Sequence, residues 1–388
     1  MIELSPDQKI IHDAAVTFVK EKKGGPHLRI GGYAGTGKST VTAQIALTLK
    51  AEEKNPRIAF CCYTGKAAYV LREKLTAAKV VSEEDEYVGT IHGLMYRPIV
   101  KDDVIVGWRR ADKIEADLIV VDEASMVDEI IWKDLLSYKI PIIAVGDHGQ
   151  LPPVGRRFGL MEKPDYALEK IHRQAEGNPI IKASIAARME GKVPVGQETT
   201  QDMGGIGVYK IVSPIGPALD LIKNLPGTLF LCGYNRTRVA LNNAIRKRLG
   251  HEGKPREGER VICLKNNREL GIFNGMGGTL KSIKEQKGHW YGLNVLMDDG
   301  ATFAGDVIKK QFGAEQTIRE MQGLEQNEIR ELFDFGYCLT VHKAQGSEAD
   351  AVVVFEERFP MMTEDDWKRW LYTAVTRARK KLLIVGRS

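Results

Sequence analysis

The feature that most constrains this chain of 388 residues is the glycine-rich loop Gly32-Tyr33-Ala34-Gly35-Thr36-Gly37-Lys38-Ser39. It lies between an apolar segment, Leu28–Ile30, and a helical pattern, Ser39–Lys50, which is the context in which this pattern binds phosphate. Glycines allow successive N–H groups to surround phosphate oxygens, and the helix start adds a favourable dipole. Lysine supplies charge, and the serine hydroxyl ligates Mg²⁺. We therefore predict nucleotide binding, with Lys38 catalytic and with contacts from Gly35, Thr36, Gly37, Ser39 and Thr40.

Two carboxylates follow the apolar run Leu118–Val121, namely Asp122 and Glu123. In an open α/β sheet the carboxyl ends of the strands face the ligand crevice. Acids also cap solvated strand ends, but a phosphate-binding loop upstream favours a catalytic pair. Asp122 is predicted to hold Mg²⁺, and Glu123 is predicted to polarise the attacking water. Together the two motifs predict hydrolysis of ATP or GTP.

The rest of the chain alternates short β-branched runs with longer amphipathic stretches, which is typical of βαβ units and parallel sheets. This alternation occurs in both halves, so we predict two α/β domains in tandem. The predicted strands are Leu28–Ile30, Ile58–Cys62, Leu118–Val121, Ile142–Val145, Thr228–Cys232, Ala351–Phe355 and Leu382–Val385. The predicted helices are Ser39–Lys50, Ala67–Ala77, Arg238–Leu249 and Glu364–Ala378.

Two segments interrupt the alternation. Residues 97–113 resemble a small hairpin with Asp102-Asp103 at its turn. Trp108 lies on the return arm of this segment. Residues 257–333 contain glycine-rich turns and short strand-like runs, namely Val261–Leu264, Gly278–Ile283 and Tyr291–Met297. They predict a β-rich insertion.

Composition excludes several classes of protein. A hydrophobic content of 43% is typical of a globular chain, and no apolar run approaches the roughly 18 residues of a membrane helix. Five cysteines without metal-ligand spacing indicate buried thiols in a reducing, cytoplasmic compartment. The net charge of +5 conceals local patterning, because residues 234–256 hold seven basic residues and one acidic residue, giving 7 − 1 = +6. That segment predicts a basic surface.

Several further motifs, in this order, resemble those of superfamily 1 DNA helicases, specifically the RecD/Dda-like 5′-to-3′ branch (superfamily 1B). The resemblance covers nearly the whole chain, although Tyr63 stands where the family often has proline. The motifs are Leu4–Gln8, Tyr63–Ala68, Thr90–His92, Gly146–Gly155, Ile171–Gln174, Tyr234–Thr237, Phe273–Gly275, Thr340–Glu348 and Leu371–Arg379.

The resemblance implies roles around the nucleotide. Gln8 would pair with the adenine edge and so favour ATP, and Gln150 would sense the γ-phosphate or its attacking water. Arg173 and Arg377 would be arginine fingers, because a planar guanidinium stabilises charge spread over phosphoryl oxygens. Gly346 and Glu348 would approach the nucleotide, whereas Arg379 is structural or faces DNA. The second domain has no phosphate-binding loop of its own, which implies that one ATP serves both domains.

The resemblance also implies a set of DNA contacts. Small hydroxyls and backbone amides at strand ends grip phosphates without reading bases. For Asn235 an ordinary turn is an equal alternative, and Asn274-Gly275 is better explained as a turn. The implied contacts are Thr64, Gly65, Lys66, Thr90, His92, Asn235, Thr340 and His342. In related helicases a hairpin inserted at the place of residues 97–113 separates the duplex, so Trp108 could stack on the last base pair as a strand-separation wedge. Packing of Trp108 against its own domain is an equal alternative.

The implied fold is α/β, with two tandem RecA-like domains. The first spans residues 1–175 and includes the hairpin. The second spans 176–256 and 334–388, with the β-rich insertion at 257–333, for which an SH3-like fold is considered.

The implied function is an ATP-dependent DNA helicase that uses Mg²⁺, translocates 5′ to 3′ on single strands and unwinds duplex. Single-stranded DNA and single-strand/duplex junctions are the expected partners, without a membrane. Single-strand-binding, replication or recombination proteins are further candidates. A monomer in a bacterial cell or phage-infected host is expected. The alternatives are a single-strand translocase or nucleoprotein remodeller with little unwinding, and a nucleotide-switched DNA-binding module.

Overall fold

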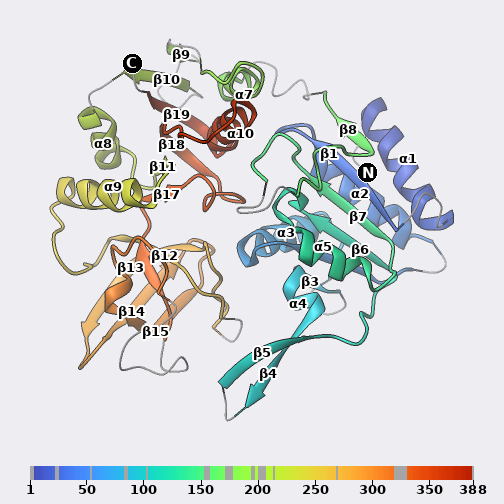
Figure 1. Cartoon of the computed structure of the whole chain (residues 1–388), viewed down its shortest axis with the longest axis horizontal. Helices are drawn as coiled ribbons and strands as arrows, with labels where there is room; N and C mark the ends of the chain where they lie inside the picture. Colours follow the sequence, from blue (N-terminus) through green and yellow to red (C-terminus); the bar gives the residue numbers. More distant parts are fainter. Residues whose placement is uncertain are drawn as a thin grey trace. The chain divides into compact units, whose positions relative to one another are not determined.

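A computed structural model of the chain describes residues 4–21, 26–52, 55–82, 86–101, 104–152, 158–170, 178–193, 197–199, 207–212, 215–267, 270–318 and 330–386. The chain forms two compact units, Met1–Gly177 and Asn178–Ser388 (Figure 1). The domain limits drawn from the sequence stay a prediction, because compactness alone does not define a functional domain.

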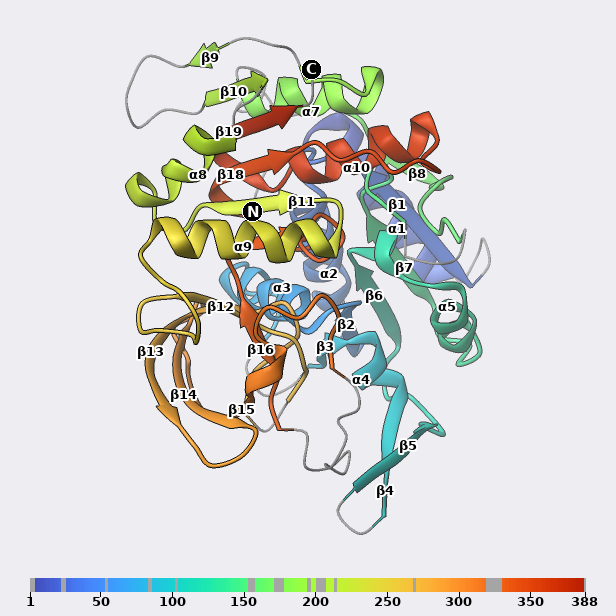
Figure 2. The same cartoon turned by 60° about the vertical axis from the view of Figure 1, so that its left-hand side comes forward.

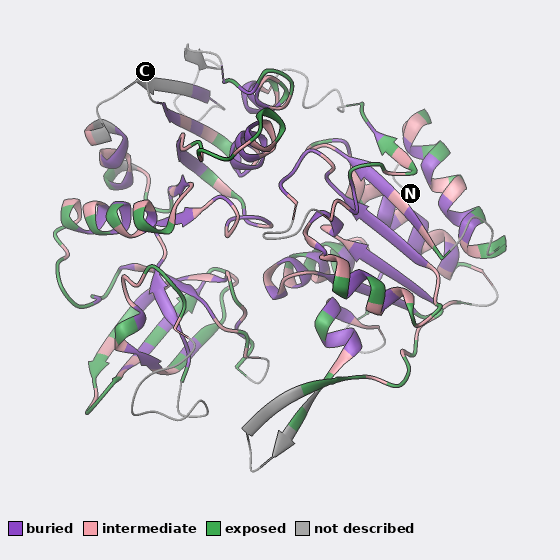
Figure 3. Ribbon diagram, viewed as in Figure 1, coloured by how far each residue is buried: buried purple, intermediate pink, exposed green. Residues whose placement is uncertain are grey.

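The first unit is built on a six-stranded parallel sheet. Four of its strands are the predicted apolar runs, and the two edge strands are only three residues long. In spatial order the strands are β3 (Val88–Thr90), β2 (Ile58–Cys62), β6 (Leu118–Asp122), β7 (Ile142–Gly146), β1 (His27–Gly32) and β8 (Tyr166–Leu168). The central strands of this sheet are buried on both faces (Figure 3), and for this reason their sequences are continuous apolar runs.

Two separate cores cover the faces of this sheet. Alternate residues of each strand point to opposite faces, so Phe60 and Val120 join one core while Cys61 and Val121 join the other. The first core is completed by α1 (Pro6–Glu21), α2 (Lys38–Lys50) and α3 (Gly65–Ala77). The second is completed by α4 (Ile91–Met95), the 3₁₀ turn η1 (Ala124–Met126) and α5 (Glu129–Leu136).

A two-stranded antiparallel ladder extends from the body of the first unit, in the segment where the hairpin was predicted (Figures 1 and 2). It consists of β4 (Tyr96–Lys101) and β5 (Val104–Arg110). The predicted turn, Asp102-Asp103, lies outside the described residues. Trp108 is 61% exposed and pairs in register with Pro98. This exposure disfavours the alternative in which Trp108 packs against its own domain.

The second unit contains a second six-stranded sheet, parallel except for one edge strand. In spatial order its strands are β17 (Cys338–Thr340), β11 (Leu229–Cys232), β18 (Ala349–Phe355), β19 (Ala378–Gly386), β10 (Gly207–Val212) and the antiparallel β9 (Gln197–Thr199). A core including Phe230 and Val353 joins it to α8 (Ile215–Asn224) and α9 (Asn235–Arg248). Two further helices, α7 (Pro179–Glu190) and α10 (Glu364–Val375), pack together and against β18 and β19.

The segment predicted to be β-rich is so, and it forms a five-stranded antiparallel sheet. Its strands, in spatial order, are β15 (Thr302–Ile308), β14 (Trp290–Met297), β13 (Gly277–Glu285), β12 (Arg260–Cys263) and β16 (Phe333–Phe335). In the chain, the turn η2 (Lys309–Gln311) follows β15. A β-bridge pairs Val307, near the end of β15, with Glu331, which lies two residues before β16 begins. The two ends of the sheet therefore meet, and we call this element the barrel. Its SH3-like character stays a prediction.

The structure confirms two tandem RecA-like α/β units and corrects several element boundaries. The predicted strand Leu382–Val385 begins four residues earlier, at Ala378, and the predicted helix Arg238–Leu249 begins three residues earlier, at Asn235. The predicted helix Glu364–Ala378 ends at Val375, and Ala378 is already the first residue of β19. The Ala349 N–H donates to the Arg377 carbonyl, 2.9 Å away, which draws the chain into the sheet. All five cysteines are buried free thiols, as predicted.

Candidate nucleotide and nucleic-acid site

The carboxyl edge of the first sheet brings most of the predicted motifs of this unit into one row. Cys62 at the end of β2 pairs with both Thr90 of β3 and Asp122 of β6, and Gly31 of β1 pairs with Gly146 of β7. The predicted DNA motifs therefore lie on one side of this row, after β3 and β2, and the phosphate-binding loop lies on the other side, after β1. The acidic pair lies between them. Four strand spacings separate β3 from β1, roughly 19 Å.

The loop after β1 has the backbone of a phosphate cradle. Gly35 and Gly37 have φ of 80° and 83°, values that side chains rarely adopt. A Cβ at Gly32 would lie only 2.7 Å from Thr36 Oγ1, so the loop closes only around glycine. α2 begins without a side-chain cap, which leaves its first N–H groups for an anion. Lys38 Nζ donates to the carbonyls of Gly32 (2.7 Å) and Tyr33 (2.9 Å), so the ammonium lies over the loop.

Gln8 is buried against this loop. Its Nε2 donates to the Thr36 carbonyl at 3.2 Å, and its Oε1 accepts the Ser5 N–H at 3.1 Å. The amide therefore fastens the start of α1 to the centre of the phosphate loop. This contact places Gln8 beside the nucleotide motif, while its pairing with adenine stays a prediction.

The acidic pair at the end of β6 has an unusual backbone. Glu123 adopts φ +52° and ψ +39°, a left-handed conformation that is uncommon for a residue other than glycine. A strained backbone conformation persists only where the surrounding fold imposes it, and such conformations cluster at functional sites. Burial of the Asp122 carboxylate raises its pKa. Three contacts partly offset this by lowering the pKa, namely the Glu123 N–H, which donates to Asp122 Oδ1 at 2.9 Å, and the charges of Lys74 and Lys38. A bound cation would favour the ionised form in the same way.

Asp147, at the end of β7, organises the turn that carries Gln150. Its carboxylate accepts the Gly149 N–H at 2.9 Å and Gln150 Nε2 at 3.3 Å. Asp147 and Gln150 are both buried. Asp147 thus has a structural position, orienting the amide that was predicted to sense the γ-phosphate.

The two DNA motifs of the first unit use threonine as a helix cap. Thr64 Oγ1 accepts the Ala67 N–H at 3.2 Å where α3 begins, so Gly65 and Lys66 lie in its first turn. Thr90 Oγ1 accepts the Gly93 N–H at 3.0 Å where α4 begins. His92 is exposed beside the Tyr96 ring, with centroids 4.8 Å apart. Capping explains both threonines structurally, so their DNA contacts stay predictions.

In the second unit, the predicted DNA residues meet at adjacent strand ends. Thr340 of β17 pairs in register with Cys232 of β11, and Asn235 opens α9 three residues after Cys232. Thr340 Oγ1 also accepts the Lys343 N–H at 3.3 Å. Burial lowers the pKa of the His342 imidazole, so it is neutral at pH 7 and offers one donor and one acceptor.

The predicted nucleotide residues of the second unit surround the start of β18. Gly346 has φ 72°, and Glu348 is exposed. Arg377 is buried, and its guanidinium donates to the carbonyls of Thr373 (2.9 Å) and Ser347 (3.2 Å). These contacts tie the end of α10 to the loop before β18. Arg379 forms an ion pair with Asp350 at 2.6 Å.

Two family models match the chain, an AAA domain over residues 16–156 and a UvrD-like helicase C-terminal domain over residues 335–385. The ATP-dependent RecD2 DNA helicase of Deinococcus radiodurans is 30% identical over 389 residues, which is 92% of this chain and 46% of the relative. RecD of the Mycolicibacterium smegmatis RecBCD enzyme is 26% identical, covering 92% of this chain and 67% of the relative. By these matches the chain is similar to RecD helicases and to UvrD-like helicases. It spans about half the length of the Deinococcus relative.

Solved structures of Pif1 helicases share the fold. A Pif1 structure at forked duplex DNA has a TM-score of 0.58 at 18% identity, covering 100% of this chain and 92% of that one. Bacteroides Pif1 bound to single-stranded DNA has a TM-score of 0.57 at 19% identity, covering 100% and 93%. At these identities the likeness concerns the fold alone.

One predicted site residue, Arg173, cannot be placed. Residues 171–177, which include the whole motif Ile171–Gln174, lie outside the described residues, as do residues 153–155 at the end of the motif that contains Gln150. The role of Arg173 stays a prediction. Among the described residues, no helix combines the length and apolarity needed to cross a membrane.

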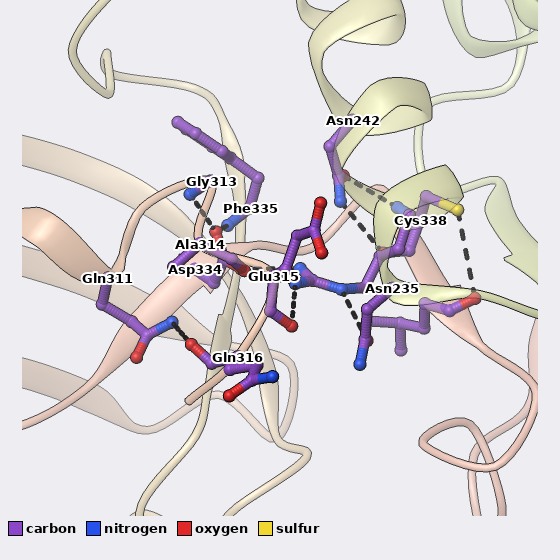
Figure 4. Close-up of polar contacts among 12 residues, drawn as sticks. Asn235, Asn242, Gln311, Gly313, Ala314, Glu315, Gln316, Asp334, Phe335 and Cys338 are labelled. Carbon is purple, nitrogen blue, oxygen red and sulfur yellow. Dashed lines mark hydrogen bonds and ion pairs between the residues drawn. The ribbon is translucent and has the colours of Figure 1, made fainter. Parts of the chain in front are cut away.

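Sequence reasoning missed a buried ionic network that joins helix α9 to the barrel. Arg238 of α9 pairs with Asp334 of β16 at 2.6 Å and donates to the Ala314 carbonyl at 2.5 Å. Figure 4 shows Asp334 beside Gly313, whose N–H it accepts at 2.7 Å. Burial raises the pKa of Asp334 in spite of Arg238. The partners lie 96 residues apart, so no local pattern announces them.

The same pairing corrects the predicted basic surface at 234–256. Four of its seven basic residues form ion pairs with acids outside the segment, so the local charge of +6 is largely offset. The pairs are Arg238–Asp334, Arg246–Glu259, Arg248–Asp220 and Lys254–Glu285. The remaining three, Arg236, Lys247 and Arg256, are exposed.

Proposed function

We propose that this superfamily 1B protein is an ATP-dependent DNA helicase that translocates 5′ to 3′ along single-stranded DNA and unwinds duplex. One observation carries the proposal. A single sheet edge holds the phosphate loop, the acidic pair and two strand-end motifs of the kind that grip a phosphate backbone. The relative from Deinococcus, an ATP-dependent DNA helicase by name, supports the same activity.

The residues fit ATP with Mg²⁺. The glycine cradle and the uncapped start of α2 suit phosphates, and exposed Ser39 and the Asp122 carboxylate supply the hard oxygen ligands that Mg²⁺ prefers. Bound Mg²⁺ would neutralise charge on the β- and γ-phosphates. Glu123 accepts a proton from the attacking water, and Gln150, oriented by Asp147, positions that water. Lys38, Arg173 and Arg377 stabilise charge on the phosphoryl oxygens, with Gly346 and Glu348 also near the nucleotide.

DNA binding is proposed to act mainly through the phosphate backbone. Thr64, Gly65, Lys66, Thr90 and His92 form the grip of the first unit, and Asn235, Thr340 and His342 form that of the second. Such contacts carry little sequence information and weaken with salt. The proposed ligands are single-stranded DNA and single-strand/duplex junctions. Single-strand-binding and replication or recombination proteins, and a monomeric state, remain part of the proposal.

Unwinding of tailed duplexes tests the proposal. Matched duplexes carrying a 5′ or a 3′ single-stranded tail are mixed with protein, ATP and Mg²⁺, and strand separation is followed by fluorescence. We expect unwinding of the 5′-tailed duplex only, with ATP hydrolysis stimulated by single-stranded DNA. Preference for the 3′ tail would overturn the polarity.

The same assays separate the two alternative functions. Displacement of a bound protein without strand separation would indicate a translocase. ATP hydrolysis that is slow and insensitive to DNA would indicate a nucleotide-switched binding module.

A further inference from the structure

An aromatic and cationic cluster lies at the carboxyl end of β11 in the second unit. The chain leaves β11 at Cys232, turns through Gly233 and Tyr234, and enters α9 at Asn235. The segment after β18 reaches the same place, because Phe359 contacts Tyr234 with ring centroids 4.4 Å apart in an edge-to-face arrangement. We call Tyr234, Arg236 and Phe359 the ring cluster.

Glu357 builds the turn that presents this cluster. Its carboxylate accepts the N–H groups of Gly233 (2.7 Å) and Tyr234 (3.1 Å) and the Thr237 hydroxyl (2.6 Å). These charge-assisted bonds fix the backbone from residue 233 to 237. A Cβ at Gly233 would lie 2.8 Å from Phe359 Cε1, so the close approach of the Phe359 ring requires glycine there. The turn is therefore held rigidly at both ends.

The ring cluster presents an exposed guanidinium beside two half-buried aromatic rings. The Arg236 guanidinium lies over the Tyr234 ring, 4.9 Å from its centroid, and Arg236 is exposed. Tyr234 and Phe359 are half-buried, and Met361 nearby in the chain is 91% exposed. A guanidinium plane and an aromatic ring are the two surfaces on which proteins stack unpaired bases.

The position of the cluster selects a nucleobase as its ligand. Tyr234 is the residue before Asn235, and β11 pairs with β17, whose Thr340 is opposite Cys232. Asn235 and Thr340 are the residues proposed to grip the phosphates. A strand gripped by its phosphates turns its bases away from them, and a stacking surface beside the grip receives one of those bases.

We propose that the ring cluster is a stacking site for one base of the single strand, a contact that adds to the phosphate grips and rests on the proposed DNA-binding function. Every base has a π-face, so the site tolerates any sequence. Loss of one such stack costs about 5- to 150-fold in affinity.

The test is a double-mutant cycle that combines removal of the Tyr234 ring with removal of one base from the DNA. Equilibrium binding is measured by fluorescence anisotropy, without ATP, for a mixed-sequence single strand and for a matched set in which one abasic site is moved along it. For the unaltered protein, one abasic position lowers affinity by about 5-fold or more. Tyr234→Leu binds the intact strand more weakly and shows no further loss at that position. Tyr234→Phe keeps the ring and restores the loss.

Arg236→Ala provides a second variant at an exposed position, should Tyr234→Leu fail to fold. It is expected to reduce the abasic effect, whereas loss of a phosphate contact would weaken intact and abasic strands equally. Lys247→Ala is the matched control, because it removes the same charge from the other end of α9, about 16 Å away, and should leave the abasic profile unchanged.

The outcomes separate the stacking site from the proposed function. If the unaltered protein binds single strands, and Tyr234→Leu and Arg236→Ala have the same dependence of affinity on abasic position as the unaltered protein, the proposed stacking site is wrong and DNA binding stands. If the unaltered protein binds no single-stranded DNA, the proposed function fails, and the stacking site fails with it.

Discussion

At the scale of single residues, Glu123 shows the most direct link between backbone and chemistry. Its left-handed conformation turns the chain sharply after β6, so the carboxylate leaves the line of the strand. Gly146 of the neighbouring β7 accommodates this turn, because a Cβ there would lie 3.0 Å from the Ser125 N–H nitrogen. Two adjacent strand ends thus fix the direction of the proposed general base.

Glu123→Gln should retain ATP binding and lose turnover. The amide has nearly the shape of the carboxylate but cannot accept the proton of the attacking water, and general-base catalysis contributes about 10²–10⁴-fold. Single-turnover hydrolysis with saturating single-stranded DNA measures the rate, and binding of a fluorescent ATP analogue provides the control. Fast turnover in the variant would remove Glu123 as the base.

The sequence reveals the residues of this site that lie in local motifs. The phosphate loop and the acidic pair are contiguous, and each residue type has a chemical reason for its place. Glu357, Asp334 and the contact of Gln8 with Thr36 were not predicted, because their partners lie 28 to 124 residues away. Only the folded sheet brings such partners together.

At the scale of elements, the hairpin is anchored firmly at its root. The Tyr138 hydroxyl contacts the carbonyls of Met95 (3.2 Å) and Ala111 (2.8 Å), which flank the hairpin, and the Ala111 N–H donates to Met95 at 2.7 Å. Arg110 reaches Asp134 and Ser137 on the side of α5. These contacts fix the base of the exposed arm that carries Trp108.

Trp108→Ala should impair unwinding and spare DNA-stimulated ATP hydrolysis, because the indole is exposed and its removal leaves no cavity. Unwinding of a 5′-tailed duplex and hydrolysis on single-stranded DNA are measured in parallel. Ile130→Ala, which truncates another exposed apolar side chain of the first unit, is the matched control and should change neither. An equal loss of both activities in Trp108→Ala would argue against a wedge.

Element prediction succeeded where periodicity was long enough to read. The buried runs that became β2, β6 and β7 are continuous and apolar, and the helix patterns of α2 and α3 lie within one or two residues of the observed bounds. Strands of three residues, such as β3, β8 and β9, are too short to show a period and were missed. The end of α10 was placed too late because the partner of Ala378 is Ala349 on β18.

At the scale of the whole molecule, one helix holds both ends of the barrel. Arg246 of α9 pairs with Glu259 at the entry to β12, and Arg238, two turns earlier, pairs with Asp334 of β16 where the chain returns. The Arg246 guanidinium also lies 3.8 Å from the centroid of the Phe335 ring. Both pairs are buried, and they tie the two ends of the barrel to the same helix.

Arg238→Met should loosen this junction and destabilise the second unit by about 3–5 kcal/mol, because it leaves the Asp334 carboxylate buried without its cation. Urea unfolding measures the loss, and hydrogen exchange across β13 to β15 shows whether the barrel opens first. Without Arg238 the pKa of Asp334 rises further, so the folded state binds more protons and stability falls as pH rises above 3.8 through the folded pKa.

The penalty of Arg238→Met should therefore shrink in acid, and adding Asp334→Asn should recover part of the stability at neutral pH. Lys254→Met removes a cation from an exposed pair with Glu285 of the barrel and should change little. Unaltered unfolding and unaltered exchange in Arg238→Met would show that the barrel is held by apolar packing alone. In that case, the buried ion pairs would not be what couples the insertion to the motor.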